Sequence, residues 1–291
     1  FGVNKSILPD VQESDGFYGK SEVLMKKIPI YGVIGDQQSA AIGQKCFNVG
    51  DIKSTYGTGC FVIQNTGKEI VYSKNKLLST IAYKVKGETA YALEGSIFMA
   101  GAIIDWLNNN LQVFDNFNEL GDILINTEIN PEVVMVPAFT GLGAPHWKPD
   151  SRASISGLTR DTNKNDIIVA SIQSVSLQTY DLIKAIQEDT HDLFKKSLQD
   201  IKVDGGMTEN QWFLQNLSDI CGTKIIKSSE QEATALGAAT LSALGSNEIN
   251  DLSEFNINSN ETVEFLPIIK TQLRSKIIKN WDIAINKTIN D

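Results

Sequence analysis

The first part of the chain alternates apolar and polar residues with a period of two. Between residues 51 and 93 it contains the segments IKSTYG, CFVIQ, STIAYKV and TAYALE. This alternation, rich in β-branched and aromatic residues, is typical of β-strands. Gly57 and Gly59 bracket Thr58 between the first two segments, which predicts a tight hairpin. We therefore expect three or four antiparallel strands here.

Helical patterns dominate the second half of the chain and alternate with short strand patterns. Residues 163–189 carry apolar side chains at helical spacing, which predicts a long and largely buried helix. Short strands are expected in IKVDGG at 201–206 and in KII at 224–226. Residues 272–286 have the pattern of a solvent-exposed amphipathic helix. A β-meander followed by alternating helices and strands indicates one α/β unit.

Two residue pairs predict where helices of the second half begin. Thr208 with Gln211, and Ser229 with Glu232, have the spacing of a capping box. The first pair precedes the helical pattern TENQWFLQNLSDIC, and the second precedes a helix that we expect to end at Gly245.

Between the two halves lies a segment rich in small residues. Residues 96–109, SIFMAGAIIDWLNN, predict a helix, and VVMVPAF at 133–139 predicts a buried strand. Four small residues around the start of this helix suggest a face for close packing or for a ligand: Gly95, Ala100, Gly101 and Ala102. A loop rich in glycine and proline at 141–160 is a candidate surface element near a site.

The composition narrows the classes of function. The chain has 291 residues, and its net charge of −9 argues against a large basic surface for nucleic acid or anionic lipid. We expect no membrane span, because no apolar run reaches the necessary length. Since the chain starts at Phe1 rather than at Met, we expect it to be a fragment.

Cysteine and histidine are few and scattered. Three cysteines far apart, without CxxC spacing, favour reduced thiols in a cytoplasmic protein. Two widely separated histidines leave too few ligands for a zinc site. These residues are Cys46, Cys60, Cys221, His146 and His191.

The segment GVIGDQQSAAIGQ, at 32–44, joins a short apolar strand pattern to a small-residue helix pattern. Asp36 stands at the junction. Its carboxylate has two possible roles. It can cap the helix by accepting from backbone N–H groups two or three residues on. It can also be a reactive carboxylate at the carboxyl end of a strand, where α/β sheets usually bind their ligands.

Two glycine motifs have the chemistry of anion sites. In YGTGC at 56–60, successive N–H groups and the Thr58 hydroxyl can bind a phosphate, or the segment can be an ordinary hairpin. In VDGG at 203–206, a nucleotide can lie against bare backbone near a helix start, or the glycines can form a structural turn. The Walker and Rossmann glycine motifs are absent from the sequence.

The order of the motifs is more specific than any one of them. GDQQ, TYGTGCF, LEGSIFMAGAIIDWL, GLGAPHWKPDSRASISGLTR and VDGGMTEN follow one another between residues 28 and 245. In this order they resemble the carboxyl-terminal domain of the FGGY carbohydrate kinases. The resemblance implies an α/β fold of the RNase H-like actin and hexokinase type, with a mixed sheet flanked by helices. It also implies that 28–291 is the second domain of the full enzyme, and that 1–27 leads in from an amino-terminal domain outside this chain.

The resemblance further implies a reaction and a set of roles. Within the family the motifs are most similar to those of members that phosphorylate glycerol with ATP, and Mg²⁺ arrives with the nucleotide rather than on ligands of this chain. It implies a cytoplasmic enzyme that forms a homo-oligomer at full length, and a domain that is inactive alone. The matching positions are Asp36 as catalytic base and substrate ligand, Gln37 and Phe61 as substrate ligands, and Thr58, Gly101, Gly206 and Asn210 as nucleotide ligands.

Some positions leave alternatives open. Phe61 can equally be a core residue. Asp105 stands where many relatives have glutamine, and we leave it out of the site, while His146 replaces a tyrosine and is interpreted as a surface aromatic. Two other functions remain: another sugar kinase of the family, of the pentulose or gluconate type, and a non-catalytic nucleotide-binding module of the actin-like group.

Overall fold

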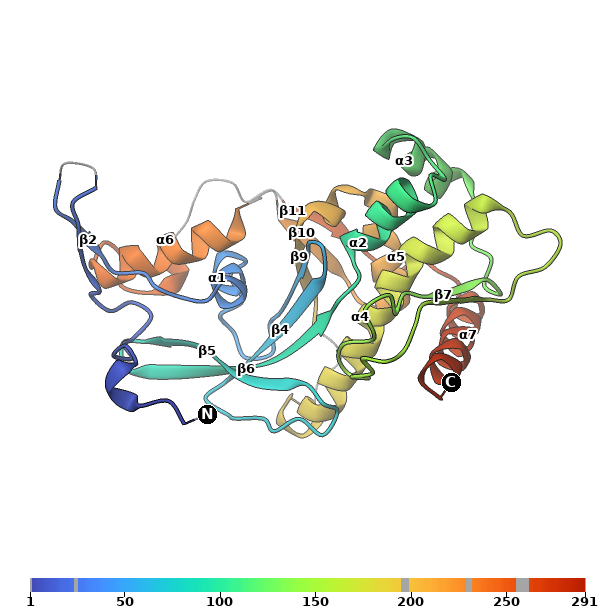
Figure 1. The fold of residues 1–291 in the computed structure, drawn as a ribbon. Helices are drawn as coiled ribbons and strands as arrows, with labels where there is room; N and C mark the ends of the chain where they lie inside the picture. The colour runs from blue at the N-terminus through green and yellow to red at the C-terminus, as the bar shows by residue number, and fades with distance from the viewer. Residues whose placement is uncertain (1, 24–25, 195–198, 229–231, 255–261, 291) are drawn as a thin grey trace.

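The computed structural model describes residues 2–23, 26–194, 199–228, 232–254 and 262–290. Its centre is a seven-stranded mixed sheet (Figure 1). The strands at 52–56 and 225–228 both run parallel to the strand between them at 201–204, and the other neighbouring pairs are antiparallel. In spatial order the strands are β11 (Thr262–Phe265), β10 (Ile225–Ser228), β9 (Ile201–Asp204), β3 (Ile52–Tyr56), β4 (Cys60–Gly67), β6 (Glu88–Ile97) and β5 (Leu78–Val85).

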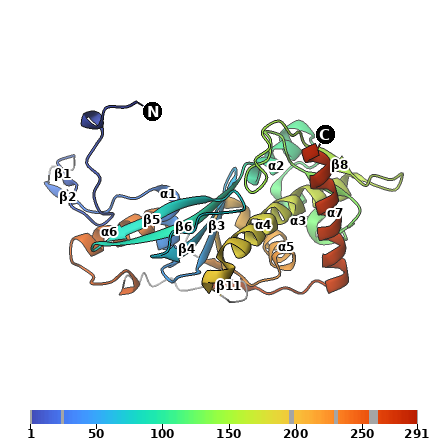
Figure 2. The same ribbon diagram turned by 90° about the horizontal axis from the view of Figure 1, so that it is seen from below.

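Helices lie on both sides of this sheet. The helix α1 (Asp36–Gly43) packs against β3 and β4, with α6 (Ala233–Gly245) beside it. The helices α4 (Lys164–Phe194) and α5 (Gln211–Cys221) lie on the opposite side, as Figures 1 and 2 show. Glycine brings α1 and α6 together, because a Cβ on Gly237 would overlap the backbone oxygen of Ser39. This contact positions the start of α1 over the sheet.

The main hydrophobic core fills the space between the sheet and α4 and α5. On β3 the side chains of Ile52 and Tyr56 belong to this core. Phe213 of α5 meets the Tyr56 ring edge-on, with 5.0 Å between ring centroids. Because side chains alternate along a strand, Lys53 and Thr55 point to the other face, which α1 covers.

The remaining elements surround this sandwich. None of the helices in the described part of the chain is long and apolar enough to cross a membrane. The elements are η1 (Lys5–Ile7), β1 (Gly19–Ser21), β2 (Ile28–Ile30), α2 (Gly101–Asp105), the π-helical turn η2 (Trp106–Asn110), α3 (Phe117–Asn126), β7 (Val134–Val136), β8 (Ser154–Ser156), η3 (Gly206–Glu209), η4 (Leu252–Glu254) and α7 (Thr271–Asn290).

Much of the predicted pattern is confirmed. Four antiparallel strands occupy the region between 51 and 97, with the predicted hairpin at its start, where Tyr56 pairs with Cys60. The long buried helix, the predicted strands and the mixed sheet flanked by helices are all present. All three cysteines are free and buried. Burial raises the pKa of each thiol to about 12, so the thiols stay protonated at neutral pH.

The helix predicted over 96–109 begins later than expected. Ser96 and Ile97 extend β6, because they pair with Phe61 and Cys60 of β4, and the helix α2 starts only at Gly101. The expected small-residue helix face is therefore wrong for Gly95. This glycine lies on β6, where a Cβ would come within 2.7 Å of a Leu182 methyl carbon.

The predicted capping box at Thr208 is also wrong. Asn210 is the N-cap of α5, and its side-chain oxygen accepts a hydrogen bond from the backbone N–H of Phe213 at 2.9 Å. Thr208 lies in η3, and its hydroxyl donates to the backbone oxygen of Gly205 at 2.7 Å. In the second predicted box, Glu232 is the N-cap of α6, whereas Ser229 lies outside the described residues.

Two terminal elements also differ from expectation. The strand expected before Asp36 spans only Ile28–Ile30 and pairs with β1 rather than with the central sheet. The helix α7 has a buried side as well as an exposed one, and its Trp281 is fully buried. It packs against β7 and α5, and hydrophobic contacts at that interface cover the apolar side of a helix that was expected to face solvent.

Candidate active site

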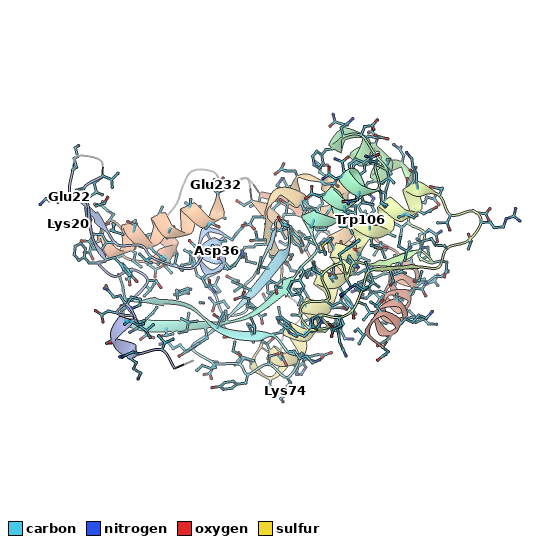
Figure 3. The ribbon with its side chains drawn as sticks, in the orientation of Figure 1. Lys20, Glu22, Asp36, Lys74, Trp106 and Glu232 are labelled. Atoms are coloured by element: carbon cyan, nitrogen blue, oxygen red, sulfur yellow. The ribbon has the colours of Figure 1, made fainter. Side chains whose placement is uncertain are left out.

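Asp36 begins α1 and does not cap it. The N-cap is Gly35, which makes no side-chain cap hydrogen bond. The Asp36 carboxylate accepts a hydrogen bond from the backbone N–H of the adjacent Gln37 at 2.8 Å. A capping carboxylate would accept from residues two or three positions on. The side chain is exposed, and Figure 3 shows Asp36 on α1 and Trp106 beyond the strands of the central sheet. The capping alternative is therefore wrong, and the carboxylate can meet a ligand.

Gln37 contacts a residue that the sequence pattern did not single out. The Nζ of Lys53 donates to the Gln37 side-chain oxygen at 2.7 Å. Lys53 is fully buried. Its burial lowers its pKa, and the carboxylates of Asp204 and Asp36 act in the opposite direction. The sequence signal was a lysine inside a predicted strand. The structure shows that both faces of this strand are covered, and a lysine is rarely buried in full without a specific partner.

Phe61 is not a core residue. Its side chain is 37% exposed, although it lies on β4 in the middle of the sheet. The register places Phe61 opposite Thr55 of β3 and opposite Ser96 of β6, on the face that carries Lys53. The core alternative is therefore wrong, and the ring is available to a ligand.

Glu94 adds a third acidic side chain to this face. It lies on β6 opposite Ile63, and the sequence analysis overlooked it. Burial raises its pKa, the Lys53 ammonium lowers it, and the Asp36 carboxylate raises it. These couplings place Asp36, Lys53 and Glu94 in one electrostatic group.

Two of the expected nucleotide residues line a cavity. This cavity has a volume of about 750 Å³, and Gly206 and Asn210 lie in its wall together with residues of α3 and Ile104. Space in front of Gly206 is open, because a Cβ built there would meet no atom within 4 Å. A cavity of this size and mostly apolar lining is typical of small-molecule sites.

Thr58 and Gly101 meet at the hairpin. The Gly101 N–H donates to the Gly57 backbone oxygen at 2.8 Å, and the N–H of Ala102 donates to the backbone oxygen of Thr58 at 3.1 Å. A Cβ on Gly101 would lie 2.7 Å from the Gly57 oxygen, so glycine is needed here to pack α2 onto the hairpin. The Thr58 side chain is exposed at the tip.

The glycine turn after β9 closes the same end of the sheet. Gly205 has a φ of +95°, and a Cβ there would overlap the backbone of Tyr56. Only glycine fits this position without strain. The structure thus brings the hairpin, the start of α2 and the VDGG turn together, although they are far apart in the sequence.

His146 is not a surface aromatic. Its Nε2 lies 2.9 Å from the Asp181 carboxylate, and the indole N–H of Trp281 donates to the same carboxylate oxygen at 2.9 Å. The His146 side chain is only 21% exposed. This network connects the 141–160 loop to α4 and α7. Asp105 is exposed at the end of α2.

No group of three or more histidine, cysteine, aspartate or glutamate side chains within the described residues could hold a metal ion. The face of the sheet that carries Lys53, which we call the polar face, meets the Asp36 carboxylate, the Gln37 amide and the exposed ring of Phe61. Gly206 and Asn210 line the cavity. This arrangement can hold a hydroxyl compound and a nucleotide together.

The mixed sheet and its helical layers have the fold of the actin and hexokinase type. Residues 52–246 match the model of the FGGY family of carbohydrate kinases, C-terminal domain. The chain belongs to the FGGY family of carbohydrate kinases.

Curated relatives and solved structures agree with this assignment. The chain is 44% identical to a glycerol kinase of Alteromonas mediterranea over 98% of its length, and 41% identical to one of Coxiella burnetii over 99%. It spans 57% of each of these relatives. The crystal structure of Plasmodium falciparum glycerol kinase with ADP matches 98% of the chain and 57% of its own, with a TM-score of 0.89 and 38% identity. A xylulose kinase of Lactobacillus acidophilus covers 98% of the chain and 58% of its own at a TM-score of 0.81 and 19% identity, which shows the shared fold.

Proposed function

We propose that this chain is the second domain of an enzyme that phosphorylates glycerol to glycerol 3-phosphate with ATP. The observation that carries the proposal is the exposed, non-capping carboxylate of Asp36 beside Gln37. The choice of substrate is supported by relatives named glycerol kinase that match 98% and 99% of the chain.

Asp36 acts as the general base. Its carboxylate accepts the proton of a primary hydroxyl of glycerol while the hydroxyl oxygen attacks the γ-phosphorus of ATP, and the bond to the bridging oxygen of ADP breaks. Gln37 forms a hydrogen bond to a substrate hydroxyl, and the exposed ring of Phe61 packs on the carbon chain. Positioning supplies most of the acceleration in such a reaction.

The nucleotide lies on the other side of the glycine loops. Thr58 contacts a phosphate, and Gly101, Gly206 and Asn210 hold the nucleotide. The fit is supported by the cavity of about 750 Å³ beside Gly206 and Asn210, and by the ADP in the Plasmodium falciparum relative. Mg²⁺ bound to ATP neutralises phosphate charge, and no residue of this chain is assigned as its ligand.

Residues 28–291 form the C-terminal domain, and 1–27 lead in from an amino-terminal domain that completes the site. β1 of the lead-in pairs with β2, so the lead-in is tied to this domain. The full-length enzyme is a homo-oligomer. It works in the cytoplasm, where reduced thiols such as the three free cysteines are stable.

A substrate panel on the full-length protein tests the proposal. A coupled ADP assay with glycerol, xylulose and gluconate should give the highest kcat/KM for glycerol, by at least about tenfold, since differential contacts to a hydroxyl are worth this much. A preference for xylulose or gluconate would assign the pentulose or gluconate type instead. Nucleotide binding without turnover of any substrate would indicate a non-catalytic module.

A further inference from the structure

A buried ammonium group lies against the substrate side of the site. Lys53 has no solvent exposure, and its Nζ donates to the Gln37 side-chain oxygen at 2.7 Å. An ammonium group removed from water is costly unless hydrogen bonds and opposite charges compensate for it. The contact between Lys53 and Gln37 is therefore a strong constraint on both side chains.

This contact determines which end of the Gln37 amide faces outward. An ammonium group can only donate hydrogen bonds, so it must meet the amide oxygen and not the amide nitrogen. With the oxygen held by Lys53, Gln37 presents its NH₂ group as a donor. The neighbouring Asp36 carboxylate can only accept. The first turn of α1 thus carries an acceptor and a donor side by side.

Carboxylates on two elements favour the charged form of Lys53 and oppose the effect of burial on its pKa. Asp36 on α1 and Asp204 on β9 both act on it electrostatically. Asp204 is 8% exposed, and its Oδ1 has no hydrogen-bond partner among the described residues. β3 and β9 pair in parallel, with Thr55 beside Asp204. Lys53 therefore lies between the helix that carries the substrate residues and the strand that leads into the glycine turn.

We infer that Lys53 is a positioning residue that sets the hydrogen-bond pattern of the substrate site. It holds Gln37 as a donor next to Asp36 as an acceptor, and this pair selects a compound with two neighbouring hydroxyl groups. One hydroxyl donates its proton to Asp36, and the other accepts from Gln37. The inference rests on the proposed function, since it concerns the same substrate side.

The test uses the full-length protein and four variants around this contact. Gln37→Glu keeps an oxygen against Lys53, which preserves folding, but removes the donor. Lys53→Met fills the same volume without the charge. Gln37→Met and the double variant with Lys53→Met complete a double-mutant cycle. Lys202→Met is the matched control, because Lys202 occupies the register position beside Lys53 on β9 and instead donates to the Lys45 backbone oxygen.

We expect kcat/KM for glycerol to fall about 10- to 100-fold in Gln37→Glu and in Lys53→Met, the range for a lost hydrogen bond to a buried polar partner. The KM for ATP should stay within about twofold, which a general loss of structure would not allow. The kcat/KM of the double variant should be no lower than that of the poorer single variant, because both substitutions disrupt the same contact between Lys53 and Gln37. Lys202→Met should resemble the wild type.

Wild-type kcat/KM in Gln37→Glu, or strictly additive effects in the cycle, would overturn the inference. If Lys53→Met fails to fold, the Gln37→Glu measurement decides, since that variant keeps the buried charge paired. A wild-type protein without glycerol turnover would overturn the proposed function, and this outcome is distinct from an active wild type whose variants are unaffected.

Discussion

The two faces of strand β3 are equally buried and chemically opposite. Ile52 is 1% exposed and Lys53 is 0% exposed, although they are neighbours in the sequence. The face with Ile52 meets α4 and α5 in an apolar core, whereas the face with Lys53 meets α1 among carboxylates and an amide. Burial alone therefore does not separate structural from functional residues in this sheet. The chemistry of the partners does.

The largest expected effect is the loss of ATP turnover when the chain is tested without the rest of the full-length enzyme. The 291-residue chain by itself should show no glycerol-dependent ATP turnover, because phosphoryl transfer needs donors on both sides of the γ-phosphate. Loss of substrate positioning lowers the reaction rate by several powers of ten, to about 10⁵-fold. ADP should still bind weakly in calorimetry, since the cavity residues are present. Turnover by the chain alone would contradict the proposed division of the site.

The next effect is the loss of the base. In the full-length protein, Asp36→Asn should lower kcat about 10²- to 10⁴-fold, the usual contribution of general-base catalysis. Nucleotide affinity by calorimetry should hardly change, because the role proposed for Asp36 is toward the substrate and not the nucleotide. Near wild-type turnover in a folded variant would show that Asp36 has no chemical role.

A pair of phenylalanines separates the two faces most directly. Phe213→Ala in the apolar core should reduce the free energy of unfolding by about 3–5 kcal/mol, the range for large-to-small core substitutions, and leave the KM for glycerol unchanged below the melting transition. Phe61→Ala, at a side chain 37% exposed, should cost less than about 1–2 kcal/mol of stability, because surface truncations are mild. It should instead raise the KM for glycerol. Denaturant unfolding and steady-state assays of both variants would check this, and equal stability losses would break the comparison.

The smallest effect is a dependence of stability on pH. Burial raises the pKa of Glu94, so folding favours the protonated form, and stability is lost as pH rises from the ordinary carboxyl range through the raised value. Glu94→Gln should therefore increase the free energy of unfolding at pH 7, by less than about 1 kcal/mol, because solvent partly screens this partly buried carboxyl. The gain should disappear near pH 4. A gain that is equal at both values would show that ionisation of Glu94 is not its cause.

The local pattern was enough for most of the elements. Period-two alternation predicted three or four strands where the structure has four, glycines around Thr58 predicted the hairpin, and the ordered motifs indicated the family and the candidate base. The local pattern was wrong about the ends of two elements, where a distant strand or a neighbouring turn sets the boundary. β6 continues through Ile97 because Cys60 of β4 pairs with it. The N-cap of α5 is Asn210 rather than Thr208, because Thr208 lies in the preceding η3.

The sequence by itself determined most of the alternating elements and the family, and it predicted roles for Asp36 and Gln37, because these depend on spacing along the chain. Only the tertiary structure decided that Asp36 is free of a capping role, that Phe61 is exposed, and that Lys53 holds Gln37. The physical reason is that residues separated in the sequence meet through sheet register and helix packing. The close contact of α1 with α6 puts Gln37 above β3, and the pleat of β3 turns Lys53 rather than Ile52 toward it.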